Sequence, residues 1–191
     1  WSPSSWVAAR PVLLIANGPS AKNHRQALTR LIERLDPVVI CMNHVAWIEP
    51  DYVDAYAFCH PTRLASFIEQ TPELKAPLIT PLEGISPSMQ ERLSSYHVFD
   101  YGLNIGPGET EVEDTACRLE APYVAAYAMA LAYAGGAREV LLAGFDGHGG
   151  DITRIANMNR CFAQLLEATP GLVVTAVTSC PYQVEHDSIY S

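Results

Sequence analysis

Short apolar runs that alternate with segments of helical spacing are the feature that most constrains the fold of this chain. The runs are rich in Val, Ile and Leu, and they lie at 12–16, 38–42, 54–59, 76–81, 138–143 and 172–177. Segments of helical pattern lie between most of them, at 27–35, 63–70, 123–133 and 157–169. Strands that are apolar on both faces belong in parallel sheets covered by helices. We therefore predict an α/β fold with an open, mostly parallel sheet and helices on both faces.

The length of 191 residues suits one domain. We expect this domain to span 11–191, and we interpret 1–10, which contain Ser and Pro, as a linker or a terminal remnant. Hydrophobic residues make up 49% of the chain and charged residues 17%, as in a globular protein. No apolar run approaches the roughly 20 residues that span a bilayer. We therefore expect no transmembrane segment, and no secretion signal is visible.

Charge and cysteine content narrow the partners and the compartment. The net charge is −9 and the 12 Lys and Arg residues are scattered, whereas nucleic-acid binding needs a basic stripe. We therefore expect no nucleic-acid partner, although a local pocket for a nucleotide remains compatible with this charge. The cysteines form no CxxC pair and lie mostly in apolar stretches, which indicates buried thiols and a cytoplasmic protein. They are Cys41, Cys59, Cys117, Cys161 and Cys180.

Polar residues follow the predicted strands, at the edge where open α/β sheets bind their ligands. They are Asn17, Asn43, His60, Asp146 and Ser179. Amides, a hydroxyl, a carboxylate and imidazoles suit a ligand with many hydrogen-bonding groups, such as a nucleotide or a sugar. The first turn lacks GxGxxG and the lysine of a Walker loop, and the chain contains no GxSxG. Dinucleotide oxidoreduction, ATP hydrolysis and the α/β-hydrolase mechanism therefore have no support.

The stretch Asn17-Gly18-Pro19-Ser20 joins the first predicted strand to a helical segment. Gly18 permits the close approach of a ligand, Pro19 fits a first helical turn, and the Ser20 hydroxyl can cap the helix or bind an anion. A strand-to-helix junction of this kind is a ready anion site. A plain turn that needs Gly and Pro for its backbone geometry is an equally good interpretation.

Two histidines and several carboxylates are candidates for catalysis or metal binding. His60 and His148 lie in the expected cleft and are our candidates for a general base, although a structural or exposed histidine is the simpler interpretation of either. Asp146 can accept hydrogen bonds from ribose or sugar hydroxyls, or it can cap the following loop. Asp146, His148 and Asp151 also suggest a metal site, but three such residues often share a short loop by chance. We expect the acidic cluster at 109–114 to be a solvated loop, and we predict neither a metal nor a cofactor.

Five motifs that together touch most of the chain follow one another in a specific order. They are VLLIANGPS at 12–20, CMN at 41–43, FCHPT at 58–62, AMAL through REVLLAGFD at 128–146, and TSCP at 178–181. In order and spacing they resemble the bacterial sialyltransferases of the lipooligosaccharide type. This resemblance implies a single Rossmann-like domain, a CMP-linked sialic acid as the donor and no metal. It assigns nucleotide binding to Asn17, Gly18, Pro19, Ser20 and Asn43, with Gly144 and Asp146 beside the donor, and we add Ser179 after the last strand.

The chain departs from that family at two places. Tyr123-Val124 stands where the family has a Thr-Ser pair before its long helix. Only 147–155 separates the Gly-x-Asp strand from the next helix, where the family has a lid with a catalytic histidine and tyrosines. We therefore expect the lid to be absent, and no histidine takes the catalytic role by alignment. A second resemblance, to the C-terminal portion of bacterial surface-polysaccharide proteins with a pyruvate-aldolase-like barrel, implies a fused or partner aldolase.

Three functions remain open from the sequence. The first is a glycosyltransferase-like domain that binds a nucleotide-activated sugar, such as a CMP-linked nonulosonate, with His60 or His148 as the base. The second is a non-catalytic module that holds a nucleotide or sugar for an aldolase. The third is pyrophosphate transfer to a pterin alcohol, as in a related Rossmann-like group, with ATP and magnesium held by acidic residues at 109–114 or 146–151. The alanine-rich segment 123–133 fits either burial or a contact in a homo-oligomer, and we favour burial.

Overall fold

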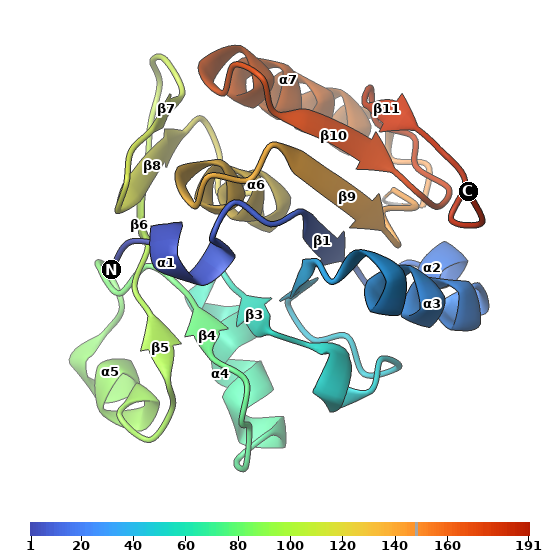
Figure 1. Cartoon of the computed structure of the whole chain (residues 1–191). Helices are drawn as coiled ribbons and strands as arrows, with labels where there is room; N and C mark the ends of the chain where they lie inside the picture. The colour runs from blue at the N-terminus through green and yellow to red at the C-terminus, as the bar shows by residue number, and fades with distance from the viewer. Residues whose placement is uncertain (148) are drawn as a thin grey trace.

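The computed structural model describes residues 1–147 and 149–191, and its centre is a parallel sheet that has eight strands within those residues (Figure 1). Every neighbouring pair of strands is parallel, and the order is β11-β10-β9-β1-β2-β3-β4-β5. The bounds are β1 Val12–Ile15, β2 Val38–Met42, β3 Ala55–Ala57, β4 Leu78–Ile79, β5 Val98–Phe99, β9 Glu139–Ala143, β10 Val173–Ala176 and β11 Glu185–His186. The predicted α/β class with an open parallel sheet is confirmed.

The central strand β1 explains why the strands are unbroken apolar runs. Alternate side chains of a strand point to opposite faces of the sheet. Val12 and Leu14 join the core on one face, whereas Leu13 and Ile15 join the core on the other, and all four are fully buried. Because helices cover both faces, every side chain of β1 points into an apolar core, which explains the apolar sequence of this strand.

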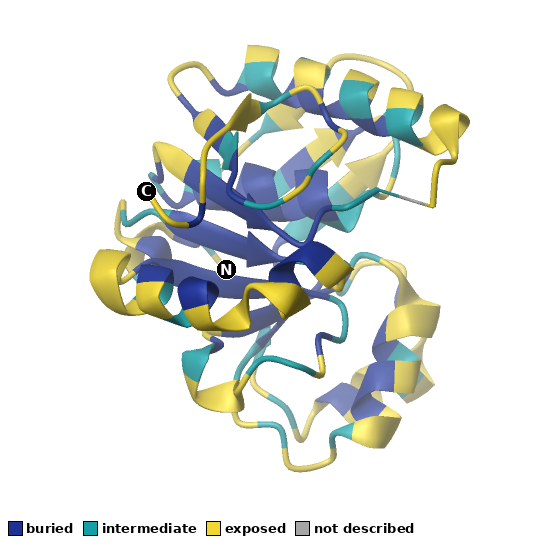
Figure 2. Ribbon diagram, turned by 90° about the vertical axis from the view of Figure 1, so that its right-hand side faces the viewer, coloured by how far each residue is buried: buried dark blue, intermediate teal, exposed yellow. Residues whose placement is uncertain are grey.

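The helices divide between the two faces of the sheet. The face with Leu13 carries α2 Pro19–Asn23, α3 Arg25–Leu35, α4 Pro61–Gln70 and α5 Pro87–Leu93, and the opposite face carries α6 Val124–Ala134 and α7 Ile152–Ala168. Figure 2 shows that the outer helices bury one side and expose the other. In α3 the buried side carries Leu28 and Leu31, and the charged residues face outward. Helix α7 begins earlier than the sequence pattern indicated, because Asp151 accepts a hydrogen bond from the Arg154 N–H at 3.1 Å and caps it.

Helix α6 lies in the core and is antiparallel to the strands. All residues from Ala125 to Ala132 are buried, so the prediction of burial for this segment is confirmed. The Cys59 thiol, just beyond β3, donates to the Pro122 carbonyl at 2.9 Å, which places the start of α6 at the carboxyl edge of the sheet. Its other end, at Gly135, is packed against Val7. Although α6 is apolar throughout, neither it nor another helix of the described chain has the length and apolarity of a membrane span.

The segment 83–120 forms structure that the sequence pattern did not predict. Helix α5 and strand β5 extend the main layers, and a second sheet follows, with the order β6-β8-β7. Its strands are β6 Gly102–Ile105, β7 Glu111–Val112 and β8 Ala116–Leu119. The buried Tyr101 ties this sheet together, because its hydroxyl donates to the carbonyls of Glu113 and Ala116, each at 3.0 Å.

Residues 1–10, interpreted above as a linker or remnant, contain helix α1 Ser4–Val7. Val7 is fully buried in the core beside α6. The Trp1 ring stacks on Phe99 with centroids 4.2 Å apart, and Trp6 meets the same ring edge-on at 5.4 Å. In this structure the segment therefore packs against the end of the main sheet.

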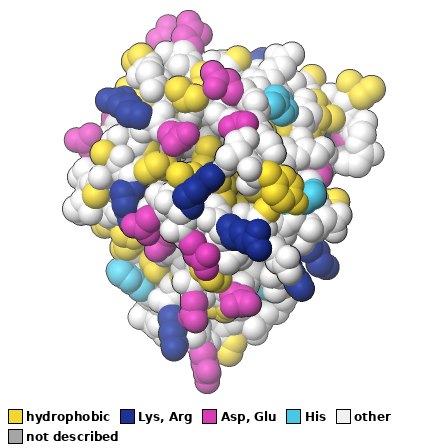
Figure 3. Space-filling view, turned by 45° about the vertical axis from the view of Figure 1, so that its right-hand side comes forward, with side chains coloured by type: hydrophobic (Ala, Val, Ile, Leu, Met, Phe, Trp, Pro, Cys, Tyr) yellow, Lys and Arg dark blue, Asp and Glu magenta, His cyan; other side chains and the backbone are white. Residues whose placement is uncertain are grey.

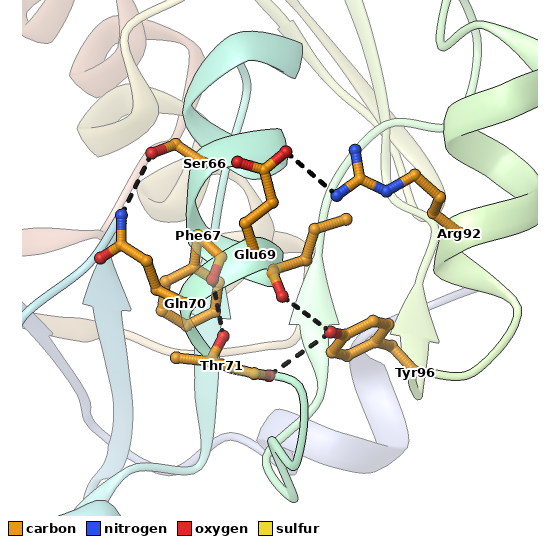
Figure 4. Close-up of polar contacts among 8 residues, drawn as sticks. Ser66, Phe67, Glu69, Gln70, Thr71, Arg92 and Tyr96 are labelled. Carbon is orange, nitrogen blue, oxygen red and sulfur yellow. Dashed lines mark hydrogen bonds and ion pairs between the residues drawn. The ribbon is translucent and has the colours of Figure 1, made fainter.

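Polar side chains connect α4 with α5 and with the residues that follow α5 (Figure 4). Arg92 of α5 forms an ion pair with Glu69 of α4 at 3.3 Å. The Tyr96 hydroxyl donates to the carbonyls of Ile68 and Thr71, at 3.1 and 3.4 Å. These contacts fasten α5 and the chain after it to the end of α4.

Candidate functional site

The strand order of the sheet reverses beside β1, and this position is its topological switch point. Strand β1 pairs with β2 on one side and with β9 on the other, so the chain winds outward from β1 in both directions. Ligands of open α/β sheets bind at such a point, beyond the carboxyl ends of the strands. The structure places the predicted strand-end residues along that edge. They are Asn17 after β1, Asn43 after β2, His60 after β3, Asp146 after β9 and Ser179 after β10.

The turn after β1 already contains an anion, which is the carboxylate of Asp146. The Ser20 N–H lies 3.3 Å from Oδ1 and 3.2 Å from Oδ2 of Asp146, and the Ser20 hydroxyl donates to Oδ2 at 2.8 Å. Helix α2 begins at Pro19, so this carboxylate lies at its N-terminus, where a negative charge is stabilised. Ser20 is itself buried, so its hydroxyl is used inside the protein. The sequence left open a bond to ligand hydroxyls or a cap on the following loop, whereas the contact present among the described residues is with the turn after β1.

Thr178 completes this network and was missed by the sequence interpretation. Its hydroxyl oxygen lies 2.9 Å from the Ser20 hydroxyl and accepts from the Gly144 N–H at 2.9 Å. The neighbouring Ser179, which we had selected, is exposed, and no side-chain hydrogen bond of it is present within the described residues. The sequence did offer one signal for Thr178: its hydroxyl comes directly after the predicted strand 172–177. We call the contacts among Ser20, Gly144, Asp146 and Thr178 the switch-point network.

Gly18 and Gly144 allow the two turns to approach each other. The Gly18 N–H donates to the Gly144 carbonyl at 3.0 Å. A Cβ at Gly18 would collide with Oδ2 of Asp146 and with the Gly144 carbonyl. Gly144 has a φ of +78°, a conformation that other residues rarely adopt. These glycines therefore serve the contact between β1 and β9 in this structure.

Two asparagines present free amides at the same edge. Asn43 has a φ of +57°, which Asn tolerates better than most residues, and its N–H donates to the Ala57 carbonyl at 3.0 Å. Asn43 is half-buried and Asn17 is exposed. Within residues 1–147 and 149–191, neither side-chain amide has a hydrogen-bond partner. Each therefore keeps its donors and its acceptor for a ligand.

Of the two candidate bases, only His60 can be assessed, because His148 lies outside the described residues. His60 is exposed and precedes α4, and its carbonyl accepts from the N–H groups of Arg63 and Leu64, each at 3.1 Å. Its imidazole has no hydrogen-bond partner in the part of the chain that is described. The ring can therefore reach a ligand, but no carboxylate orients it.

Thiols and phenols line the edge on the α6 side, and burial keeps them protonated. Burial raises the pKa of Cys59 to about 12 and also raises the pKa of Cys180. Burial, and then the neighbouring Cys180 and Tyr123, raise the pKa of Tyr182. Because a thiol reacts as its thiolate, Cys59 and Cys180 are poor nucleophiles near neutral pH. All five cysteines of the chain are free.

The acidic residues considered for metal binding are engaged or dispersed. Among the described residues, no three His, Cys, Asp or Glu side chains lie close enough together to hold a metal ion. Asp151 caps α7 and pairs with Arg154 at 3.5 Å, and Glu111 of the acidic cluster pairs with Arg118 at 3.8 Å. Of the loop suggested as a metal site, His148 lies outside the described residues.

Two cavities lie beside α3 and away from the strand-end residues. The first, of about 320 Å³, is lined by Arg25, Gln26, Leu28, Thr29, Ile32, Trp47, Ile48, Glu49 and Tyr52. The second, of about 340 Å³, is lined by Asn23, His24, Arg25, Gln26, Ala27, Arg30 and Tyr190. The sequence interpretation found neither of them, because each is formed by segments that are distant along the chain.

Comparison of the sequence with family models and with curated proteins gives no match. The functional argument therefore depends on the geometry of the described residues and on the motif resemblance.

Proposed function

We propose that the carboxyl edge of the sheet binds a nucleotide-activated sugar and that the domain transfers this sugar to an acceptor. The observation that supports this best is the pair of free amides, Asn17 and Asn43, on the two adjacent strands beside the point where the sheet changes direction. Amides that both donate and accept can pair with the edge of a nucleobase or with ribose hydroxyls. A CMP-linked nonulosonate, used in cytoplasmic steps of bacterial surface-polysaccharide synthesis, is the donor that the sialyltransferase resemblance favours.

The start of α6 supplies a second element of the proposed site. Helix α6 begins at the carboxyl edge near Cys59, and Tyr123 before it makes no side-chain cap to the first turn. The free N–H groups and the positive end of the helix dipole favour a negatively charged group there. The phosphate of the nucleotide therefore belongs near α6 in this proposal, since Asp146 occupies the N-terminus of α2.

His60 is the described residue that fits the catalytic role. Sugar transfer requires that an acceptor hydroxyl lose its proton to a base. The His60 imidazole is exposed and follows β3, next in the sheet to the strand that carries Asn43. We assign it the proton transfer in this mechanism.

A non-catalytic binding module, serving a fused or partner aldolase, is the second candidate. The observation that favours it is the lack of a side chain that orients the His60 ring among the described residues. A general base usually needs such a partner to hold its tautomer and geometry. Turnover of a bound donor separates the two candidates.

The test is a calorimetric titration with CMP, UDP and ATP, with and without magnesium. Asn43→Gly is the variant of choice, because glycine adopts the positive φ without strain while the amide is removed. Asn104→Ala, at an exposed position of β6 outside this edge, is the matched control. We expect metal-free binding of CMP that Asn43→Gly weakens by about 1 kcal/mol, the scale of one hydrogen bond, and that the control leaves unchanged.

Two results would overturn the proposal. Equal weakening by Asn43→Gly and Asn104→Ala would show that the amide after β2 does not contact the nucleotide. Binding of ATP with magnesium, and of no other nucleotide, would favour pyrophosphate transfer. If CMP binds as expected but a CMP-linked sugar is neither hydrolysed nor transferred, the non-catalytic module is the better description.

A further inference from the structure

Positive charge is concentrated on α2 and α3 of an otherwise acidic protein. The net charge of the chain is −9, yet the segment 20–34 carries four basic residues and one carboxylate, Glu33. The basic residues are Lys22, Arg25, Arg30 and Arg34. In Figure 3, which brings the side with α2 and α3 toward the viewer, Lys and Arg side chains lie among Asp and Glu side chains across the visible face.

These cations have no carboxylate partner within the described chain. The ion pairs found there lie elsewhere, at Arg92–Glu69, Arg118–Glu111, Arg154–Asp151 and Arg160–Glu120. Glu33, the carboxylate on α3, accepts instead from the Tyr52 hydroxyl at 3.0 Å. The guanidinium groups of Arg25 and Arg30 therefore keep all their donors available.

The cavity of about 340 Å³ lies among these groups and contains no carboxylate in its lining. Ala27, which is buried, is its apolar residue, and the other lining side chains are polar or aromatic. The His24 Nδ1 lies 2.7 Å from the Tyr190 hydroxyl, with the two rings nearly perpendicular. When the Tyr190 hydroxyl donates to Nδ1, the imidazole carries its proton on Nε2 and keeps it as a further donor.

We propose that this cavity binds the phosphate group of a small phosphorylated molecule. Guanidinium groups match phosphate oxygens with parallel hydrogen bonds, and Arg25 and Arg30 both line the cavity. Asn23 and Gln26 add amide donors, and the cavity adjoins the N-terminal turn of α3, an 11-residue helix whose dipole favours an anion there. The volume is near the lower end of known ligand pockets, about 300–1,000 Å³, which suits a phosphate with a small organic part.

The neighbouring cavity of about 320 Å³ is a weaker anion site. It shares Arg25 and Gln26, but it also contains the Glu49 carboxylate and the apolar side chains Ile32 and Trp47. A carboxylate in the lining would repel a phosphate. The phosphate cavity is thus the one that includes Arg30 and His24, and it is separate from the carboxyl edge and independent of the function proposed there.

The test is a titration of the ¹⁵N-labelled protein with inorganic phosphate and with glycerol 3-phosphate, followed by NMR at constant ionic strength. We expect saturable shifts confined to residues 23–30 and 190. The double variant Arg25→Gln and Arg30→Gln should weaken binding by about tenfold or more, since hydrogen bonds to charged groups are lost. Arg30→Lys keeps the charge but loses the planar fork, and should also weaken binding.

Two control variants and one further probe complete the test. Arg34→Gln removes a charge from the same helix outside the cavity, and Arg92→Gln removes one that is already paired. Both should change the affinity less than about twofold. An effect of Arg34→Gln as large as that of the double variant Arg25→Gln and Arg30→Gln would overturn the site, because it would show diffuse charge attraction. Binding to phosphatidic acid vesicles without binding of the soluble phosphates would equally overturn a small-molecule site.

Discussion

The turn after β1 and the start of α3 follow one another along the chain, but they use their polar groups in opposite ways. At the turn, Ser20 is bonded to Asp146 and Thr178, so the switch-point network is complete within the protein. On α3, Arg25 and Arg30 have no carboxylate partner among the described residues and border an open cavity. The comparison shows that a strand-turn-helix motif can have the features of an anion site because it binds a carboxylate of the same chain, here that of Asp146. Arg25 and Arg30, which line the cavity and have no such partner among the described residues, lie on the next helix.

The largest effect is expected from Gly18→Ala, which tests how closely the two turns must approach. The added Cβ meets the Asp146 carboxylate and the Gly144 carbonyl, and a backbone group cannot move away cheaply. We expect the free energy of unfolding to fall by about 3 kcal/mol, at the upper end for overpacking, in a urea titration. Gly106→Ala, where the added Cβ meets nothing within 4 Å, is the control and should change it by less than about 0.5 kcal/mol. Equal effects of the two variants would show that the turns are not in tight contact.

Asp146→Asn tests whether the internal carboxylate is the anion of the turn. The amide keeps the size of the side chain but loses the charge that the Ser20 N–H and hydroxyl contact. We expect a loss of about 2 kcal/mol in the free energy of unfolding, the scale of hydrogen bonds to a charged group. Urea titrations of the variant and the wild type measure the loss. Equal stability of the two proteins would show that the charge of Asp146 does not hold the turn.

Thr178→Val tests whether the Thr178 hydroxyl, rather than the Ser179 hydroxyl that the sequence suggested, stabilises the switch-point network. Valine has the same shape but leaves the buried Gly144 N–H without its acceptor. We expect the free energy of unfolding to fall by about 1 kcal/mol, whereas Ser179→Ala should leave it nearly unchanged because Ser179 is exposed. A larger loss for Ser179→Ala than for Thr178→Val would contradict the network. Urea titrations of the two variants and the wild type decide the matter.

The layered fold could be predicted from the sequence because its signals are local. The runs at 12–16 and 140–143 are apolar at every position, as expected of strands buried on both faces, and both became central strands. The segment 83–120 could not be predicted, since β5 and β7 have two residues each and β6 to β8 depend on pairing with one another. A strand of that length has no periodicity to detect.

The candidate site was predicted only at the level of the edge. Parallel topology alone puts Asn17, Asn43 and His60 beyond the ends of neighbouring strands, so their placement followed from the fold. The partner of Ser20 did not follow, because Asp146 lies 126 positions away and its contact depends on the exact approach of two turns. The phosphate cavity is less predictable still. His24 meets Tyr190 over 166 positions, and a missing ion pair has no signature in a sequence.

The smallest effect is expected from Arg25→Gln in the protein without ligand. The sign of the change in the free energy of unfolding sharpens the comparison most. Arg25 is the first residue of α3, where a positive charge opposes the helix dipole, and it has no carboxylate partner in the described chain. Its removal should raise the free energy of unfolding by about 0.3 kcal/mol at low salt. Arg92→Gln should lower it by about 0.5 kcal/mol, because Arg92 lies in the last turn of α5 and pairs with Glu69. Thermal unfolding at low ionic strength compares the two variants, and a loss of stability in both would remove the contrast. If the signs differ, Arg25 lowers the stability of the protein without ligand, as expected of a residue that serves phosphate binding.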